Sequence, residues 1–342
     1  IEEVIEEARN GKMYILVDDP DRENEGDLIV PAQMATPDAI NFMAKHGRGL
    51  ICLALNKKQI DNLKLPLMSP INKSRMQTAF TISIEAKKGI TTGISAHDRA
   101  KTIKIAINPK TKKKDIVSPG HVFPLVARQG GVLERAGHTE ASVDIAILSK
   151  LNPSSVICEV MNEDGRMARL NDLLKFSKKH KIEIASIEDI ISYRIQSEKL
   201  ISRINFKTFL LKRSEKIQVY KYKNKLGSNI NFAITKGNLS PNKSTPVRVL
   251  STRIKKNNIL NNNEIKKTLK FLSKYKNFLL LIINNTNITN DKNINTLRYY
   301  GIGAQIIKDL KVKNMILISR RKKKIIGLEG FGLKIKKQII IK

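Results

Sequence analysis

The sequence predicts an α+β protein with two domains: a mixed α/β domain over residues 1–197 and a smaller α/β domain over residues 198–342. Short apolar runs typical of strands alternate with helical patterns through the first half. The composition then changes near residue 198, and a chain of 342 residues is long enough for two domains.

The change in composition is mainly a change in charge. Residues 1–197 contain 29 Lys and Arg against 25 Asp and Glu, whereas residues 198–342 contain 34 against 6. Such a basic half can attract a polyanion such as nucleic acid. It can equally reflect drift in an AT-rich genome, because Lys, Asn and Ile have A/T-rich codons. Aromatic residues are not interleaved with the basic ones as in single-strand binders, so we favour drift over a nucleic-acid partner.

The remaining composition favours a reducing cytoplasm. Two cysteines, Cys52 and Cys158, do not make a disulfide framework. There is no run of about 18 apolar residues, so no membrane span is expected. Residues 1–8 form an acidic amphipathic helix rather than the basic start and apolar core of a secretory signal. We therefore expect a cytoplasmic protein.

The elements expected in the first domain follow from local patterns of apolar residues. Strands are predicted at residues 14–17, 28–30, 50–55, 80–84 and 155–161, and helices at residues 1–8, 36–45, 98–107, 140–149 and 169–179. The second helix has a clear start, because Thr36 can cap it and Pro37 suits its first position. Residues 122–127 are apolar but contain Pro124, so we expect them at an edge or bend. In the second domain, residues 278–283 predict a core strand.

An acidic turn separates the first two strands. Residues 18–27 hold six carboxylates and Arg22. Like charges this close repel one another, and folding alone does not require them. Mg²⁺ prefers oxygen ligands and usually takes one or two carboxylates plus waters and substrate oxygens. The turn therefore indicates either a Mg²⁺ or Mn²⁺ site with an anion-binding arginine, or a solvated acidic turn.

Two turns place polar groups where packing does not require them. Residues 91–99 open a helix with several hydroxyls, which suits either a bound phosphate or a plain helix cap made by Ser95 or Asp98. Residues 118–121 place His121 after a Pro-Gly turn. Lone histidines are usually structural or surface groups, so neither turn is decisive alone.

The segment 128–140 carries a stronger signal. Its glycines let the backbone approach a ligand, and Arg135 can grip a phosphate or carboxylate through two hydrogen bonds. His138 and Thr139 then open a helix, whose N-terminus favours anions, and His138 can also supply a nitrogen to a metal. Glu159 lies in an otherwise apolar strand, where burial would raise its pKa toward a value useful for proton transfer, unless it is a rim carboxylate in a salt bridge.

Together these segments resemble 3,4-dihydroxy-2-butanone 4-phosphate synthase, a family of riboflavin-pathway enzymes. The similar segments keep the order of the family and are residues 21–27, 46–49, 92–96, 119–121, 135–140 and 162–167. They cover residues 1 to about 195. Pro20 stands where many relatives carry an acid, but it precedes the Arg-Glu core, so we expect activity to be retained.

The resemblance implies an α+β homodimer with active sites near the dimer interface. It implies D-ribulose 5-phosphate as substrate, with L-3,4-dihydroxybutan-2-one 4-phosphate and formate as products. It also implies two divalent ions, Mg²⁺ or Mn²⁺, with Glu23 contacting both and His138 the second. The residues implied to surround the substrate are Arg22, Glu23, Asp27, Arg135, Ala136, Gly137, His138, Thr139 and Glu159.

The chemistry of this conversion explains the choice of groups. A proton is lost next to the ketone, a hydroxyl leaves as water, the skeleton rearranges, and formate is released after water attacks. A metal pair stabilises the negative oxygens, and a carboxylate must take the proton. Glu159, Asp27, Glu25 and His121 are the available acid–base groups, and we expect Glu159 and His121 to be essential, since both match positions that the family needs for turnover. Cys52 either lines the pocket or is a small buried apolar residue.

The second half resembles, at its end, the GTP cyclohydrolase II domain that is fused to this synthase in bifunctional enzymes. Residues 300–310 and 327–333 carry the resemblance, and residues 247–251 echo the segment before the family's metal site. Three zinc cysteines expected after Ser251 are missing, and zinc hydrolysis needs such ligands. We therefore expect no zinc and no GTP cyclohydrolase II activity.

Other departures support a degenerate second domain. The glycine- and arginine-rich phosphate loop is missing, and Thr296 stands where an acid is expected two residues before Arg298. Residues 319–322, Ser-Arg-Arg-Lys, replace a Thr-Asn-Asn-Pro turn. The domain can still fold, and it would then steady the dimer or hold a partner enzyme.

Two other functions stay open from the sequence. One is a basic scaffold or nucleic-acid-binding protein in which both halves have lost catalysis, although the carboxylates, Arg135, His138 and Glu159 of the first half argue against it. The other is a different metal-dependent sugar-phosphate isomerase or aldolase, which detection of released formate would exclude.

Overall fold

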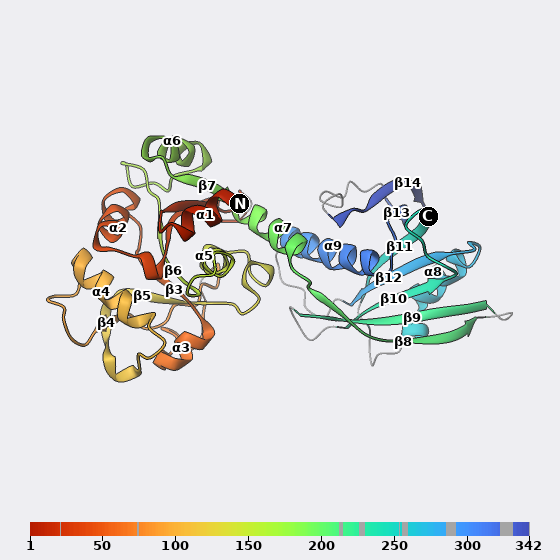
Figure 1. Ribbon diagram of the computed structural model, residues 1–342, viewed down its shortest axis with the longest axis horizontal. Coiled ribbons are helices and arrows are strands. Elements are labelled where there is room, and N and C mark those ends of the chain that lie inside the picture. Colours follow the sequence, from red (N-terminus) through yellow and green to blue (C-terminus); the bar gives the residue numbers. More distant parts are fainter. Residues whose placement is uncertain are drawn as a thin grey trace. The chain divides into compact units, whose positions relative to one another are not determined.

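The computed structural model describes all residues except 21, 74, 212–214, 226–229, 253, 255–258, 285–291, 322–330 and 342. It divides into two compact units, Ile1–Ile191 and Ser192–Lys342 (Figure 1). The boundary falls within helix α7 (Ile187–Ser197), slightly before the one expected at 197/198. Asp21 and residues 327–330, singled out in the sequence, lie outside the described residues, as do the side chains of Thr296 and Arg298.

The first unit is built on a seven-stranded mixed sheet with the strand order β4-β5-β3-β6-β2-β1-β7. The strands are β1 (Tyr14–Val17), β2 (Gly26–Pro31), β3 (Cys52–Asn56), β4 (Ile84–Ala86), β5 (Ile116–Ala127), β6 (Ser154–Glu159) and β7 (Glu183–Ser186). β1 pairs with β7 and β3 pairs with β5 in parallel, and the other neighbours are antiparallel. The predicted mixed α/β architecture is confirmed.

Helices cover both faces of this sheet. They are α1 (Glu2–Arg9), α2 (Pro37–Phe42), α3 (Lys57–Leu63), α4 (Ala96–Ala106), α5 (His138–Leu148) and α6 (Leu170–His180). On one face, Ile40 of α2 and Ile103 of α4 join Leu53 in the main core. On the other face, Val143 of α5 packs with Ala54 of β3. Because side chains alternate along a strand, every second residue of β3 counted from Ala54 also points toward α5.

The second helix begins as predicted. The Thr36 hydroxyl accepts a hydrogen bond from the Ala39 amide, and Pro37 occupies the first helical position. The helix continues through a π-helical turn, Met43–Gly47, and the left-handed residue that ends it is Arg48 rather than a glycine. The glycines on either side of Arg48 instead allow close packing against Cys158 and Glu159.

Of two expectations about strands, one is wrong. Residues 80–84 form only isolated bridges at Phe80 and Thr81, and the regular strand begins at Ile84. Residues 122–127 belong to β5 and agree with the expected edge: regular pairing with β4 ends at Val122, and beyond it β5 has β3 on one side and only isolated bonds to residues 79–81 on the other. Pro124 is tolerated there because its carbonyl accepts from the Thr81 amide, so its nitrogen faces that short bridged segment and not β3.

The second unit has its own seven-stranded sheet, in the order β14-β13-β11-β12-β10-β9-β8. Its elements are β8 (Ile201–Leu211), β9 (Glu215–Asn224), β10 (Ile230–Lys236), β11 (Ser244–Thr252), α8 (Asn263–Leu272), β12 (Phe278–Asn284), α9 (Lys292–Asp309), β13 (Asn314–Ser319) and β14 (Lys334–Ile340). The predicted core strand is confirmed, because every residue of β12 is buried. Leu269 of α8 and Leu280 of β12 share the core on one face of this sheet.

Among the described residues, no helix combines the length and the apolar character that crossing a bilayer requires.

Candidate active site

Several polar side chains gather at one end of the first sheet, on the face covered by α5. Asp27, at the start of β2, lies opposite Glu159, at the end of β6, and opposite Leu16 of β1. Phe123 of β5 lies one row further into the sheet, in register with Cys52 of β3. The antiparallel pairing of β2 with β6 thus makes neighbours of two carboxylates that are far apart in the sequence.

The first turn of α5 brings an imidazole to these carboxylates. His138 Nδ1 lies 3.6 Å from Glu23 Oε2 and 3.8 Å from Asp27 Oδ1. Its Nε2 lies 3.2 Å from the carbonyl oxygen of Leu16, to which a protonated Nε2 donates. The carbonyl therefore fixes the ring and turns Nδ1 toward the carboxylates.

Burial and like charge control the protonation of this cluster. Burial raises the pKa of Asp27, and Glu159 and Glu23 add to that rise, although His138 opposes it. Burial alone would lower the pKa of His138, but Asp27 and Glu23 outweigh it and raise the pKa to about 9. Burial is likewise outweighed at Glu23, where His138 and Arg22 lower the pKa. A proton on His138 thus partly balances the negative charge, and a bound cation would compete with that proton.

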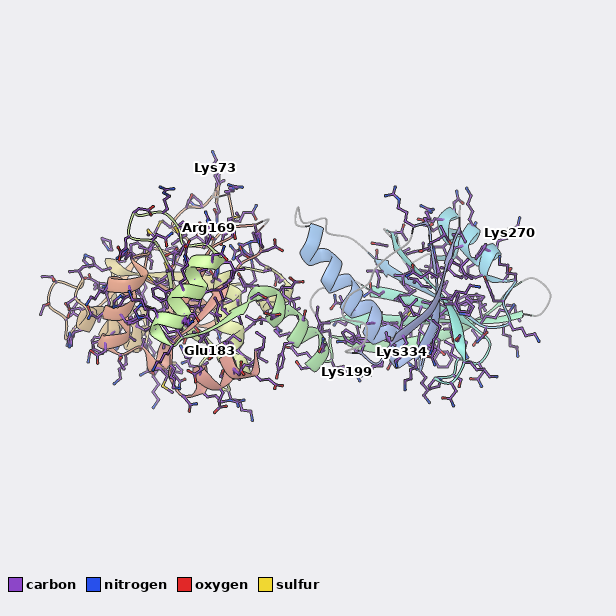
Figure 2. The ribbon with its side chains drawn as sticks, turned by 90° about the horizontal axis from the view of Figure 1, so that it is seen from above. Lys73, Arg169, Glu183, Lys199, Lys270 and Lys334 are labelled. Carbon is purple, nitrogen blue, oxygen red and sulfur yellow. The ribbon has the colours of Figure 1, made fainter. Side chains whose placement is uncertain are left out.

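The acidic turn is held in shape by two arginines. Arg22 Nη1 lies 2.6 Å from Asp18 Oδ2 and 3.2 Å from Glu23 Oε2, so the guanidinium joins two carboxylates of the turn. Arg169, just before α6 and labelled in Figure 2, donates from Nη1 to the carbonyl oxygens of Glu23, at 2.9 Å, and Asn24, at 2.5 Å. The turn is therefore a braced structure rather than a freely solvated one.

Glu159 is held by a close approach of the backbone. Its Oε2 accepts a hydrogen bond of 2.8 Å from the Leu50 amide. A Cβ atom on Gly49 would lie 2.5 Å from both the carbonyl oxygen and Oε2 of Glu159, so only glycine fits there. A Cβ atom on Gly47 would lie 2.9 Å from the Cys158 sulfur. The glycines around Arg48 therefore serve packing against the end of β6.

The Arg135 side chain, just before α5, makes its hydrogen bonds with Glu140 of that helix and with residues 76 and 78. Its Nη1 donates to Glu140 Oε2 at 2.6 Å, and its Nη2 donates to the carbonyl of Met76 and the hydroxyl of Thr78. A Cβ atom on Gly137 would lie 2.4 Å from Nη1, so this glycine makes room for the guanidinium. Ala136 and Thr139, beside them, are buried.

His121 lies on the same strand as Phe123, two residues earlier, and so at the same end of the sheet as Glu159. Two strand spacings, about 10 Å, separate the backbones of β5 and β6. The His121 side chain is 45% exposed, and its Nδ1 contacts Glu85 Oε1. Gly93 makes room for this pair, because a Cβ atom there would overlap Glu85 and approach His121 Nδ1.

The hydroxyl-rich turn before α4 is a helix cap. Asp98 accepts hydrogen bonds from the amides of Thr91 and Gly93 and from the Thr91 hydroxyl, while Ser95 caps the helix. Those amides are therefore already used. Cys52 is buried, and burial raises the pKa of its thiol, so it is a protonated buried residue next to the carboxylates.

The donor set suits a hard cation. The Oδ1 atom of Asp27 is buried and has no hydrogen-bond partner among the described residues, although such atoms normally have one. No group of three or more His, Cys, Asp or Glu in the described part of the chain can hold a metal by itself. Glu23, Asp27 and His138 together fit an ion that takes most of its ligands from waters and substrate, which is typical of Mg²⁺.

Sequence reasoning missed three residues of this region. Arg169 binds backbone carbonyl oxygens, and no sequence motif predicts such a contact. Glu85 comes from a short strand and meets His121 only through the fold. Asp18, the partner of Arg22, lay in the acidic stretch, and its spacing of four residues from an arginine was an available signal.

Comparison with known proteins gives two family matches. Residues 2–193 match the family model described as 3,4-dihydroxy-2-butanone 4-phosphate synthase, and residues 283–340 match the model of GTP cyclohydrolase II. The chain is 44% identical over 374 residues to "Riboflavin biosynthesis protein RibBA" of Aquifex aeolicus, a match that covers 100% of this chain and 92% of the relative.

Two solved structures extend the comparison. RibBX, a two-domain 3,4-dihydroxy-2-butanone 4-phosphate synthase from A. baumannii, aligns with a TM-score of 0.83 and 38% identity, covering 100% of this chain and 98% of that chain. A 3,4-dihydroxy-2-butanone 4-phosphate synthase in complex with two magnesium ions aligns with a TM-score of 0.55 and 37% identity, covering 57% and 96%. The resemblance drawn from the sequence motifs is confirmed.

Proposed function

The chain belongs to the 3,4-dihydroxy-2-butanone 4-phosphate synthase family, and from this premise we propose that its first unit is the lyase that forms L-3,4-dihydroxybutan-2-one 4-phosphate and formate from D-ribulose 5-phosphate. The reaction is a step of riboflavin biosynthesis. One water leaves and one water enters, so the five carbons of the substrate divide into four and one without net hydration. The observation that carries the proposal is the buried cluster of Glu23, Asp27 and His138 beside Glu159.

Glu23 and His138 are the residues that would hold two Mg²⁺ or Mn²⁺ ions, Glu23 contacting both and His138 the second. The support is the unpartnered Oδ1 atom of Asp27, the oxygen-rich donor set, and a related synthase structure described as a complex with two magnesium ions. When bound, the ions supply positive charge to the ketone and hydroxyl oxygens of the substrate. Because a metal-binding imidazole must be neutral, His138 would have to be deprotonated to hold an ion.

Glu159 and His121 are assigned the essential proton transfers. The Leu50 amide donates to Glu159 Oε2 and so fixes the orientation of the carboxylate. Since Oε1 takes no part in that bond, we assign the proton abstraction to Oε1. Glu85 accepts from His121 Nδ1, which leaves Nε2 as the atom that gives or takes a proton. Two groups held by separate partners at one end of the sheet can serve different proton transfers.

The remaining assigned residues orient the substrate. Arg22 holds Glu23 by an ion pair, and Asp27 Oδ1, which has no hydrogen-bond partner among the described residues, can accept from a substrate hydroxyl. Residues 135–139 present a guanidinium and the N-terminus of α5, which attracts anions such as the phosphate group. In this assignment Arg135 exchanges part of its contact with Thr78 and Met76 for the phosphate.

The second unit is assigned no GTP cyclohydrolase II activity and no zinc. Residues 198–342 contain neither cysteine nor histidine, the ligands that hold catalytic zinc most often. We further propose that the protein is a cytoplasmic homodimer with its active sites near the dimer interface. Incubating the full chain with zinc and GTP should give neither bound zinc nor turnover, and appreciable activity would overturn this part.

Release of formate from ribulose 5-phosphate tests the main proposal. The full chain with Mg²⁺ should release one formate per substrate, chelator should stop the reaction, and added Mg²⁺ should restore it. Glu23→Ala should be inactive under every condition. The matched control is Glu163→Gln. That side chain is 93% exposed, and its ion pair with Arg48 is long, at 3.9 Å. Turnover that is independent of divalent ions, or isomerisation without formate, would contradict the proposal.

A further inference from the structure

Two histidines of the first unit lie in a ring cluster away from the assigned catalytic groups. Phe42 of α2 and His46 of the π-helical turn meet Phe176 and His180 of α6 (Figure 1). The ring centroids of His46 and His180 are 4.9 Å apart, and those of Phe176 and His180 are 4.4 Å apart. The four rings therefore join the end of α6 to α2 and to the π-helical turn that follows it.

Neutral imidazoles suit this cluster. His180 meets Phe42 edge-on, with ring centroids 5.2 Å apart and planes at 90°, and rings in this arrangement attract each other. One protonated ring is also accommodated, since a cation is attracted to an aromatic face. Protonation of both histidines is different, because it brings two positive rings together at a centroid distance of 4.9 Å, where like charges repel.

Basic neighbours add to the cost of a second proton. Burial lowers the pKa of His46, and Lys45, Lys179 and Arg48 lower it further. Burial also lowers the pKa of His180, with His46 and Lys179 adding to the effect. The C-terminal end of a helix favours positive charge, but Lys45 and Lys179 already supply it at these two ends.

Carboxylates of the surrounding elements do not offset this charge at either ring within the described part of the chain. Asp38 lies in the first turn of α2, two turns before His46. Asp172 lies at the opposite end of α6, where it accepts from the side chain of Asn162. Glu183, the charged residue of the strands beneath α6, is exposed at the start of β7, and Glu163 lies 3.9 Å from the Arg48 guanidinium.

The other end of α6 holds the acidic turn. Arg169, directly before the helix, donates to the carbonyl oxygen of Glu23 and to that of the next residue. Leu173, in the first turn, packs directly on Gly26, because a Cβ atom on that glycine would lie 2.4 Å from Leu173 Cδ1. The 11 residues of α6 span about 16 Å as one rigid element, so a movement at His180 reaches the backbone of the turn.

We propose that His46 and His180 form an acid-sensitive latch, which holds α6 on the π-helical turn while the rings are neutral and releases it when each ring has taken a proton from the solvent. Release of α6 loosens the hold of Arg169 and Leu173 on the acidic turn. The consequence for catalysis, weaker cation binding in acid, rests on the proposed function of the first unit. The latch itself does not depend on that function.

Amide hydrogen exchange of the full chain at pH 7.5 and pH 5.5, followed by mass spectrometry, tests the latch. The intrinsic exchange rate depends on pH, so the unmodified chain is compared with His180→Phe at the same pH. Phenylalanine keeps a ring in the cluster but takes no proton. In α6 and in residues 18–27, the rate of the unmodified chain relative to the variant should rise about fivefold from pH 7.5 to pH 5.5, which is one unit below the pKa of a free histidine.

Two further variants show which histidines are responsible. His46→Phe should behave as His180→Phe does, because either substitution leaves a single titrating ring in the cluster. His97→Phe is the matched control, since His97 is an exposed residue of α4 outside the cluster, and this variant should keep the acid response. Circular dichroism checks the fold of each variant, and the two latch variants report independently. The exchange is measured without metal or substrate, so its result is separate from a failure of the proposed activity.

Three results would overturn the proposal. The first is a relative exchange rate in α6 that stays constant between the two pH values for the folded latch variants. The second is an acid response confined to α6, which would show that residues 18–27 are not coupled to the histidine pair. The third is loss of the acid response in His97→Phe as well, which would place the titrating group elsewhere.

Discussion

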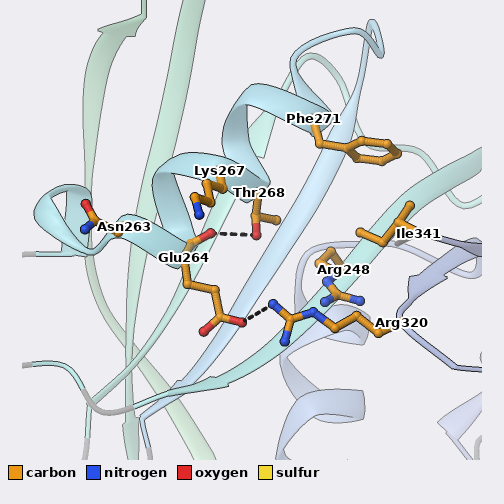
Figure 3. A pocket seen from close by; sticks show the side chains of 8 residues that line it. All are labelled: Arg248, Asn263, Glu264, Lys267, Thr268, Phe271, Arg320 and Ile341. Carbon is orange, nitrogen blue, oxygen red and sulfur yellow. Dashed lines mark hydrogen bonds and ion pairs between the residues drawn. The ribbon is translucent and has the colours of Figure 1, made fainter.

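The two units handle buried charge in opposite ways. In the first unit the carboxylates of Glu23 and Asp27 lie beside the His138 imidazole, and Asp27 Oδ1, 3.8 Å from His138 Nδ1, has no hydrogen-bond partner among the described residues. In the second unit Arg320 forms an ion pair with Glu264 (Figure 3), and the Nε atom of the buried Arg248 has no hydrogen-bond partner among the described residues. An unpartnered acceptor suits a bound cation, whereas an unpartnered donor does not.

This contrast shows that net charge is a weak guide to a site. Residues 1–197 carry an excess of four positive charges, which gives no indication of a cation site. The acidic turn is nevertheless concentrated in residues 18–27 and braced by arginines. In the second unit the large positive excess is spread over the surface.

The largest effect is expected from Glu159→Gln. The amide oxygen can still accept the hydrogen bond from Leu50, but the side chain can no longer take a proton. We expect formate release to fall about a thousandfold, within the range for loss of a general base. A variant that keeps more than a tenth of the activity would show that Glu159 is not the base.

The next effect concerns the glycine behind Glu159. Gly49→Ala places a Cβ atom against the backbone of Glu159, at 2.5 Å from its carbonyl oxygen and 2.7 Å from its nitrogen. Since backbone atoms cannot rotate away, we expect about 3 kcal/mol of destabilisation in urea unfolding. Gly165→Ala is the control, because no atom lies within 4 Å of its Cβ position and only the left-handed backbone costs energy, about 1 kcal/mol. Equal losses would mean that the Gly49 contact is unimportant.

The protonation of the cluster predicts a pH effect on the metal-free protein. The pKa of His138 is raised to about 9 in the fold, against about 6.5 for an unperturbed histidine. The protonated ring therefore stabilises the fold fully below about pH 6.5, and this contribution is lost as the pH rises through about 9. We expect the free energy of unfolding, measured in chelator, to fall by about 3 kcal/mol over that interval.

The control for this pH effect is His138→Gln, which has no titrating ring. Its stability should vary less between pH 6.5 and 9 than that of the unmodified chain. Saturating Mg²⁺ should also flatten the profile, because the cation replaces the proton as the positive partner of Glu23 and Asp27. A pH profile shared by all three samples would contradict the electrostatic account.

The smallest effect is expected from Arg169→Ala. Arg169 holds the carbonyls of Glu23 and Asn24, and its Nη1 lies 3.9 Å from Glu25 Oε1. Loss of this brace should raise the Mg²⁺ concentration needed for half-maximal activity about tenfold, with less effect on the rate at saturating Mg²⁺. Arg169→Lys should restore part of the loss. An equal loss of rate at every Mg²⁺ concentration would assign Arg169 another role.

Much of the fold was predictable where one face of an element is uniformly apolar. The strands β1 and β12 and the helices capped by Thr36 and Ser95 follow directly from sequence. Residues 80–84 were predicted as a strand because their apolar residues alternate. That pattern does not show whether a neighbouring strand is available for pairing.

The candidate site was predictable as a set of motifs but not as a geometry. The motifs named Glu23, Asp27, His138 and Glu159, while the register of β2 with β6 makes neighbours of Asp27 and Glu159. Arg135 looked free to bind an anion, yet Glu140, within the same motif, holds it. The pocket of the second unit shown in Figure 3 was not foreseen, because its residues come from β11, α8 and the end of β13, which only the fold brings together.

Equilibrium binding of Mn²⁺ to the full chain, followed by the loss of the free-ion signal in electron paramagnetic resonance, tests the central claim most directly. We predict two bound ions per chain, both lost in Glu23→Ala and both kept in Glu163→Gln. An unchanged number of ions with unchanged affinity in Glu23→Ala would show that the braced acidic turn is not the metal site.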